Sequence, residues 1–564
     1  MKGKSSYPLL SLGAAVRAVR HVYLMTAVLA LVACGGHSST SSSSYTVGGT
    51  ISGLTASSVV LIYNDATTVT VAAGATTWVF PGSFAAGSSY SVTVQTQPAG
   101  ELCAVTSGGN GTTLTANVDN ATVVCSVYGQ WTWEGGLNTV NGSGVYGTQG
   151  TAAASNLPGA RYDSSSWTDS SGNFWLFGGY GYDSAVGLGS LNDLWRYSPS
   201  TGLWTWVGGG NEDNASGVYG TLGTAAAGNL PGARYSASSW IDSSGNLWLF
   251  GGFGYDATGA VGRLNDLWQY SPSSGLWTWV SGGDGENTSG VYGTQGYDSA
   301  GNLPGARYSA SSWIDSAGNL WLFGGVGYDS TGAIGNLNDL WRYSPSTGQW
   351  TWVSGGNVDN AAGVYGTQGS ASASNAPGAR QAASSWIDSS GNLWLFGGYG
   401  YDSTGGAGYL NDLWQYSSST GLWTWVNGGD VDDASGVYGT QGTAAASTVP
   451  GARQAANSWI DSSGRLWLFG GAGYDSTGAV GNLNDLWQYS SSTGLWTWVS
   501  GGSGDNATGA YGTQGTVSAS TLPGARQAAN SWIDSSGHLW LFGGAGYGST
   551  DNGYLNDLWQ FVPP

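Results

Sequence analysis

Six arginines and six aspartates recur in this sequence at near-constant intervals, and they are the charged side chains best suited to chemistry. Each arginine ends a Pro-Gly-Ala-Arg motif, and successive arginines are 73 residues apart (234 − 161). Each aspartate belongs to an Asn-Asp-Leu-Trp motif further along the same repeat. The arginines are Arg161, Arg234, Arg307, Arg380, Arg453 and Arg526, and the aspartates are Asp193, Asp266, Asp339, Asp412, Asp485 and Asp557.

These arginines have two interpretations. Free guanidinium groups gathered around one axis would attract anions, which makes the six arginines tentative ligand-binding residues. Alternatively, each arginine pairs with the aspartate of its own repeat. We favour pairing, because an unpaired ring of like charge is costly where solvent is scarce.

A recurrent tyrosine in Gly-Val-Tyr-Gly is the second tentative ligand-binding residue, because aromatic side chains on loops can stack on sugars. The set is Tyr146, Tyr219, Tyr292, Tyr365 and Tyr438, with Tyr511 in Gly-Ala-Tyr-Gly. The tyrosines of Gly-Tyr-Asp are further loop candidates: Tyr182, Tyr255, Tyr328, Tyr401 and Tyr474. The tryptophans are assigned mainly to core packing, because burying about 200 Å² of each contributes roughly 5 kcal/mol.

Short acidic clusters lie between each Trp-Thr-Trp and the next Pro-Gly-Ala-Arg, at 211–214, 284–287, 357–360 and 430–433. Alternate carboxylates beside carbonyl oxygens can hold calcium. The spacing lacks the full calcium-loop pattern, however, and the equivalent segment 138–141 has no acid. We therefore favour solvated turns over calcium sites, and no other cofactor or metal is predicted.

All these motifs belong to a unit that occurs six times, which marks a repeat architecture. Within one unit, the runs Ser-Trp-Ile-Asp and Leu-Trp-Leu-Phe flank a Ser-Ala-Gly-Asn turn, and Leu-Trp-Arg-Tyr and Gln-Trp-Thr-Trp flank a Ser-Pro-Ser-Thr-Gly turn. Each pair predicts a β-hairpin, so the unit predicts a four-stranded sheet. Apolar residues at adjacent positions indicate that both sheet faces are covered, as in a β-propeller.

The two ends of the repeat region complement each other. The last unit stops at Pro564 without its fourth strand, whereas an isolated Trp131-Thr-Trp133 precedes the first complete unit. We therefore expect the N-terminal strand to complete the last sheet and to close a ring of six blades. Closing so long a loop costs roughly 5 kcal/mol, which one strand with two buried tryptophans can offset.

The Gly-Gly doublet that ends the second strand, followed by a Tyr and a Trp with six residues between them (Tyr343 to Trp350), resembles the kelch repeat. The resemblance covers residues 127–564 and implies an all-β, six-bladed kelch-type propeller closed by its N-terminal strand. It also places the arginines at the start of the innermost strand, near the mouth of a central channel. Because this unit is longer than a usual kelch repeat, each blade is expected to carry one long loop.

The resemblance to the kelch and galactose oxidase superfamily does not extend to the copper site, which uses two Tyr, two His and a Cys. The propeller region contains no Cys and only His538, in a hairpin turn. The turn motif of six-bladed sialidases also fits poorly, because 242–248 is one residue too long for it. Near-identical units provide few distinct residues for one catalytic centre, so no catalytic residue is predicted.

The first 34 residues resemble a bacterial lipoprotein signal peptide. Basic residues precede an apolar run at 22–33, which is too short for a comfortable membrane span. The run ends in a lipobox-like Leu-Val-Ala-Cys, which implies acylation of Cys34 and a lipid anchor, and Gly35 favours the outer membrane. An ordinary signal peptide with an incidental Cys is the alternative. Residues 35–44 form a Ser-rich tether.

Residues 45–126 differ from the rest in composition and predict a small β-sandwich. Four apolar runs read as strands, at 59–63, 68–71, 90–94 and 121–125. Cys103 and Cys125 are the only cysteines besides Cys34, and in an exported chain they predict a disulfide.

The charge composition disfavours some classes of binding partner. Without Lys2, Lys4, Arg17 and Arg20 of the signal peptide, the chain has 10 cationic residues (14 − 4) against 33 acidic ones. Such a surface disfavours nucleic acid and anionic lipid headgroups as partners.

Taken together, these features lead us to expect a monomeric, non-enzymatic lipoprotein, periplasmic or surface-exposed, that binds an extracellular glycan or protein through repeated loops. The alternatives are a carbohydrate-active enzyme and a purely structural envelope protein.

Overall fold

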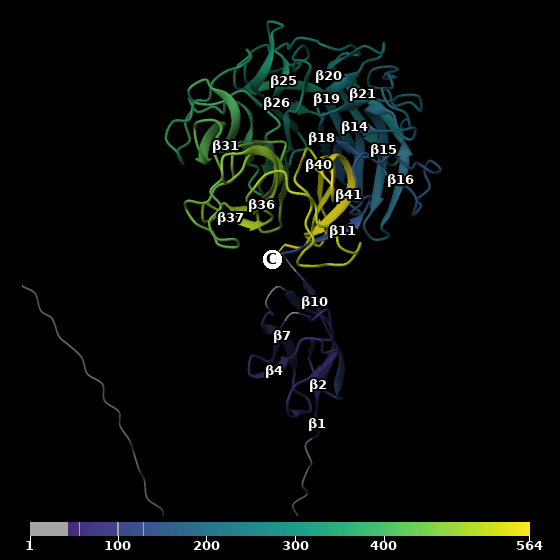
Figure 1. The fold of residues 1–564 in the computed structure, drawn as a ribbon, viewed down its shortest axis with the longest axis vertical. Helices are drawn as coiled ribbons and strands as arrows, with labels where there is room; N and C mark the ends of the chain where they lie inside the picture. Colours follow the sequence, from purple (N-terminus) through teal and green to yellow (C-terminus); the bar gives the residue numbers. More distant parts are fainter. Residues whose placement is uncertain (1–42, 56, 99–100, 128, 564) are drawn as a thin grey trace, which may run out of the picture.

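The protein is built from strands and turns in the computed structural model (Figure 1), which describes residues 43–55, 57–98, 101–127 and 129–563. The predicted signal peptide at 1–34, its Cys34 and nearly all of the predicted 35–44 tether lie outside the described residues. Within the described ranges, no helix has the length and apolar character needed to cross a membrane.

The N-terminal region contains three small sheets with a shared core (purple in Figure 1). Two are four-stranded, in the orders β5-β2-β10-β8 and β4-β3-β7-β9, and β1 pairs with β6. The strands are β1 (Ser44–Tyr45), β2 (Val47–Ser52), β3 (Val59–Tyr63), β4 (Thr67–Val71), β5 (Thr77–Val79), β6 (Phe84–Ala85), β7 (Tyr90–Thr96), β8 (Glu101–Ser107), β9 (Asn110–Gly111) and β10 (Val118–Val127). All four strands predicted in this region are present.

The rest of the chain forms six repeated four-stranded antiparallel sheets. In each sheet the inner strand is split into two short pieces, which both pair with the second strand. The pieces are β12 (Arg161–Tyr162) and β13 (Ser165–Thr168), β17 (Arg234–Tyr235) and β18 (Ser238–Ile241), β23 (Arg307–Tyr308) and β24 (Ser311–Ile314), β28 (Arg380–Gln381) and β29 (Ser384–Ile387), β33 (Arg453–Gln454) and β34 (Asn457–Ile460), and β38 (Arg526–Gln527) and β39 (Asn530–Ile533).

The second and third strands form the longest hairpin of each sheet. The second strands are β14 (Phe174–Tyr182), β19 (Leu247–Tyr255), β25 (Leu320–Tyr328), β30 (Leu393–Tyr401), β35 (Leu466–Tyr474) and β40 (Leu539–Tyr547). The third strands are β15 (Leu188–Ser198), β20 (Val261–Ser271), β26 (Ile334–Ser344), β31 (Ala407–Ser417), β36 (Val480–Ser490) and β41 (Asn552–Phe561).

Trp-Thr-Trp forms the fourth strand, as the sequence predicts. In the first five sheets this strand is β16 (Leu203–Gly208), β21 (Leu276–Ser281), β27 (Gln349–Ser354), β32 (Leu422–Asn427) and β37 (Leu495–Ser500). In the sixth sheet it is β11 (Trp131–Gly135), which pairs antiparallel with β41 so that Thr132 lies opposite Gln560. A short additional strand, β22 (Asp298–Ser299), pairs with the edge of β27.

Tryptophan packing joins neighbouring sheets. One cluster combines Trp240 and Trp248 of the second sheet with Trp341 and Trp350 of the third, and all four are at most 4% exposed. Equivalent clusters lie between the other neighbouring sheets, including one that contains Trp131 and Trp559. This confirms core packing as the role of these tryptophans.

The Gly-Gly doublet does not end the second strand, which corrects the sequence-based expectation. Gly324 and Gly325 lie inside β25, at a register shift, with φ values of 65° and 90°. A Cβ on Gly324 would come within 2.7 Å of the Arg380 carbonyl oxygen in the next repeat. Glycine therefore permits the close approach of neighbouring sheets at this bulge.

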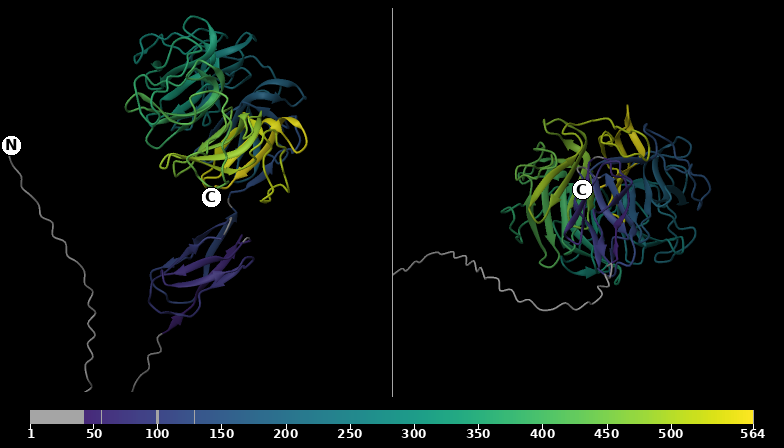
Figure 2. Two further views of the ribbon diagram at one scale, coloured as in Figure 1. Left: turned by 60° about the vertical axis from the view of Figure 1, so that its left-hand side comes forward. Right: turned by 90° about the horizontal axis from the view of Figure 1, so that it is seen from below.

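The N-terminal sheets lie to one side of the repeated sheets, next to the C terminus (Figure 1; Figure 2, left). The Gly129 N–H, between β10 and β11, donates to the Val562 carbonyl oxygen at 2.7 Å. The chain therefore enters the repeat region beside the point where it leaves it.

Candidate functional site

The recurrent arginines and aspartates form six buried ion pairs, which confirms the pairing interpretation. In the third repeat, Arg307 Nη1 donates to Asp339 Oδ1 at 2.7 Å and Nη2 donates to Oδ2 at 2.8 Å. The arginine also donates to the carbonyl oxygens of Gly305 and Gly324, both at 3.0 Å. The other five pairs have the same geometry.

These pairs lie inside the sheets. Neither side chain of any pair exceeds 1% exposure. The arginines therefore do not present an open anion-binding surface, and their observed role is to tie the inner strand to the third strand of the same sheet.

The tyrosines of Gly-Val-Tyr-Gly also point inward, which corrects the expectation that they are exposed on loops. The Tyr292 hydroxyl donates to Asp339 Oδ2 at 2.5 Å, and Trp341 Nε1 donates to the same oxygen at 2.6 Å. Burial, together with the negative charge of Asp339, raises the pKa of Tyr292 well above its usual value. All six equivalents are 5–6% exposed and make the same bond: Tyr146, Tyr219, Tyr292, Tyr365, Tyr438 and Tyr511.

The residue before each of these tyrosines is exposed instead, and in five of the six repeats it is a valine. Val145, Val218, Val291, Val364 and Val437 are 46–52% exposed, and alanine occupies the sixth position. The loop backbone is pinned at each valine: for example, Val291 N donates to Leu303 O at 2.8 Å and Leu303 N donates to Val291 O at 2.9 Å. From the sequence we chose the neighbouring tyrosines and missed these exposed valines. The available signal was a β-branched residue directly after a glycine.

The acidic loops carry structural hydrogen bonds. Asn360, which ends the cluster at 357–360, has a φ of 57°, and its Oδ1 accepts from the Asn336 N–H at 3.0 Å. In the part of the chain that the structure describes, no three His, Cys, Asp or Glu side chains gather where they could hold a metal ion. Solvated turns therefore stay the prediction for these loops, and calcium binding stays the untested alternative.

His538 occupies the predicted turn position between β39 and β40. Its Nδ1 lies 3.0 Å from Asp534 Oδ2, and its side chain is 28% exposed. In the third repeat Asn319 occupies this position and donates to Asp315. The histidine therefore replaces an asparagine in a turn.

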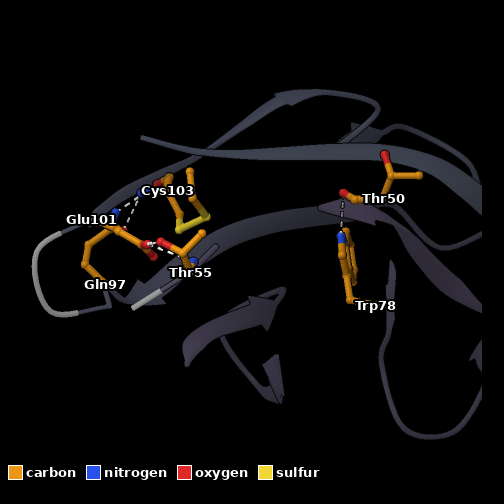
Figure 3. The surroundings of a disulfide bond; sticks show 7 residues. Thr50, Thr55, Trp78, Gln97, Glu101 and Cys103 are labelled. Carbon is orange, nitrogen blue, oxygen red and sulfur yellow. Dashed lines mark hydrogen bonds between the residues drawn. A yellow bond between two sulfur atoms is a disulfide. The ribbon is translucent and has the colours of Figure 1, made fainter. Parts of the chain in front are cut away.

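The predicted Cys103–Cys125 disulfide is present (Figure 3). It joins β8 and β10, where the two cysteines lie directly opposite each other. Gln97 braces the same strand, because its Nε2 donates to the Cys103 carbonyl oxygen at 2.9 Å and its Oε1 accepts from the Cys103 N–H at 2.7 Å. Thr55 donates to Glu101, the first residue of β8, through both its backbone N–H and its hydroxyl.

A cycle of six backbone hydrogen bonds links the inner strands, at the break between their two pieces. Each N–H donates to the carbonyl oxygen of the equivalent residue in the preceding repeat at 2.8–2.9 Å, and Asp163 of the first repeat donates to Ala528 of the sixth. Every residue in the cycle has a φ of 50–54°. The six residues are Asp163, Ser236, Ser309, Ala382, Ala455 and Ala528.

The inner strands therefore differ between the two halves of the repeat region. Beside the cycle, the first three repeats have Tyr162, Tyr235 and Tyr308, and the last three have Gln381, Gln454 and Gln527. The Tyr162 ring lies 6.3 Å from Tyr235 and 5.1 Å from Tyr554. The sequence showed this asymmetry but not the hydrogen-bond cycle.

Comparisons with known proteins do not assign this chain to a family. No protein-family model matches the chain, and a search of curated proteins finds no significant match.

Proposed function

We propose that the six sheets form a closed, six-bladed propeller of the kelch type, preceded by a small β-sandwich. We further propose that it is a non-enzymatic scaffold that binds an extracellular protein through its repeated loops. The observation that carries the binding proposal is the exposed valine that recurs on five equivalent, hydrogen-bonded loops.

Two contacts support a closed ring. The hydrogen-bond cycle runs through all six repeats and returns from the sixth to the first. In addition, β11 supplies the fourth strand of the sixth sheet, and its Trp131 ring packs 5.0 Å from Phe469 and 5.2 Å from Phe561. Pairing this edge also removes an exposed strand that would invite aggregation.

The repeated valines favour a protein partner over a glycan. Sugar recognition relies on exposed aromatic faces, and the tyrosine of each Gly-Val-Tyr-Gly loop is buried. The tyrosines of Gly-Tyr-Asp end the second strands instead of lying on loops, and they are half-buried. Each valine presents a small aliphatic surface on a loop that needs no further ordering, which lowers the entropic cost of binding. Several weak contacts on one rigid scaffold add through effective concentration, so a repetitive partner would bind tightly.

The signal-peptide features support export and lipid anchoring at Cys34. We propose an outer-membrane lipoprotein, held to the membrane only through this anchor, whose repeated sheets face the periplasm or the medium. The excess of acidic residues supports partners other than nucleic acid.

The test uses full-length protein as bait against intact cell-envelope proteins and against a glycan array. A variant with the five valines changed to Asp should lose the captured protein, since each charge disrupts an aliphatic contact. The matched control changes Val358 and Val431, which are 48% and 51% exposed outside this motif. Loss of binding in both variants, or glycan binding that the valine changes leave intact, would contradict the proposal.

A further inference from the structure

A small cavity lies beside the hydrogen-bond cycle of the inner strands. Its volume is about 180 Å³, which corresponds to roughly six water molecules of liquid. Every lining residue belongs to the break in an inner strand. The lining is unequal: Asp163, Ser164, Ser236 and Ser309 supply polar groups from the first three repeats, whereas the last three repeats supply only alanines.

The fold does not require the Asp163 carboxylate. The equivalent residues in the other repeats are Ser or Ala, with φ values within 4° of the 54° of Asp163. They also make the same backbone hydrogen bond. The other five repeats therefore form the same backbone structure without a carboxylate.

Asp163 has no cationic partner among the described residues. Its Oδ2 accepts a hydrogen bond from the Ser236 hydroxyl at 2.8 Å, and none of the ion pairs between described residues involves Asp163. Arg161, two residues away, is already ion-paired with Asp193. Asp163 is half-buried, and a carboxylate that is partly removed from water without a cation is less stable than a paired one. A positive charge bound in the cavity would therefore stabilise this site.

Aromatic rings lie next to the cavity, although none of them is among its lining residues. Tyr162 and Tyr235 directly precede Asp163 and Ser236 along the inner strands. The third tyrosine of this set, Tyr308, already carries a guanidinium over its ring, with Arg263 Cζ at 5.4 Å from the centroid. The negative face of an aromatic ring attracts such groups.

We propose that this cavity binds a small organic cation, a protonated primary amine, through the Asp163 carboxylate and the hydroxyls of Ser236 and Ser309, whereas the Ser164 hydroxyl donates to the Gly178 carbonyl oxygen at 2.9 Å. The site is separate from the exposed loop valines and goes beyond the function proposed for them. An ammonium group matches it because its three N–H donors can bond to a carboxylate and two hydroxyl oxygens at once. The alanine side accommodates a short alkyl group.

Binding should weaken in acid. Burial raises the pKa of Asp163 to about 6, and the hydrogen bond from the Ser236 hydroxyl offsets part of this increase. The neighbouring Tyr162 and Tyr235 have pKa values raised by burial, so they stay neutral in this range. Protonation of Asp163 below about pH 6 therefore removes the charge that attracts the amine.

The experiment is calorimetric titration of full-length protein with methylammonium and with n-butylammonium at neutral pH. Asp163→Ala and Asp163→Ser are matched variants, because they install the residues that other repeats have at this position. We expect either variant to weaken amine binding about tenfold or more, the scale of a lost charge-assisted hydrogen bond. Asp163→Asn should weaken it similarly, because it keeps the shape and removes the charge.

Three results would overturn the proposal. They are absence of amine binding by the unchanged protein, equal binding by Asp163→Ala, and equal binding of a neutral polyol such as glycerol. Loss of protein capture by the loop-valine variant, with amine binding intact, would bear on the loop proposal alone.

Discussion

Arg307 and Asp339 form a two-pronged ion pair at 2.7 and 2.8 Å in which neither side chain is more than 1% exposed. The pair joins β23 to β26 across the sheet. Its net contribution against an apolar replacement is small, because both charges lose their hydration. Breaking it is costly, however, because one charge is then buried alone.

Changing Arg307→Met should therefore destabilise the protein by about 3–5 kcal/mol. The measurement is the free energy of unfolding from urea titration. Arg263→Met is the control, because Arg263 lies over Tyr308 without an ion pair, and it should cost about 1 kcal/mol or less. Equal losses for the two variants would show that the buried pair has no special role.

Stability should fall steeply in alkaline solution. Burial and a neighbouring aspartate raise the pKa of each tyrosine of the Gly-Val-Tyr-Gly set above its usual 10. Above about pH 10 the unfolded chain releases protons that the folded chain keeps, so unfolding becomes more favourable. With six such groups, the free energy of unfolding should fall by up to about 8 kcal/mol for each pH unit.

Urea titrations from neutral pH upward measure this slope. Tyr292→Phe should reduce it by the share of one tyrosine, because that proton is no longer released. Stability that stays flat beyond pH 10 would show that these tyrosines titrate as easily in the folded protein as in the unfolded chain.

The fold could be predicted largely because the strand signal is repeated six times. Ser311–Ile314 and Leu320–Tyr328 form the predicted hairpin, and the arginine–aspartate pairing follows from two motifs of equal count. The direction of Tyr292 could not be predicted, because a tyrosine between glycines suits either a loop surface or a buried hydroxyl. The cycle through Asp163 was also hidden, since its residues are Asp, Ser or Ala and only their φ values unite them.

Gly324→Ala should cost about 2 kcal/mol or more, because the new Cβ would lie 2.7 Å from the Arg380 carbonyl oxygen and the residue has a positive φ. Gly318→Ala in the same sheet is the control. It has a φ of +81° and nothing within 4 Å of the new Cβ, so it should cost only about 1 kcal/mol of backbone strain. Thermal unfolding of both variants separates the steric clash from the backbone strain. A larger loss of stability for Gly318→Ala than for Gly324→Ala would contradict this account of the bulge.

Removal of the disulfide should destabilise the N-terminal sheets selectively. The bond closes a segment of 22 residues, for which chain entropy predicts a loss of about 3 kcal/mol. Hydrogen exchange of a Cys103→Ala, Cys125→Ala variant should show faster exchange in β2, β8 and β10 and unchanged exchange in β24 to β27. Equal acceleration in both regions would mean that they unfold as one unit.

The most direct test concerns the completion of the sixth sheet by β11. Thr132 lies opposite Gln560, as Thr278 lies opposite Gln269 within the second sheet. Thr132→Cys with Gln560→Cys should therefore form an intramolecular disulfide about as completely as Thr278→Cys with Gln269→Cys, measured by peptide mass spectrometry after mild oxidation. Cross-linking of the second pair but not the first, or links only between separate molecules, would contradict the pairing of β11 with β41 and the closed ring that depends on it.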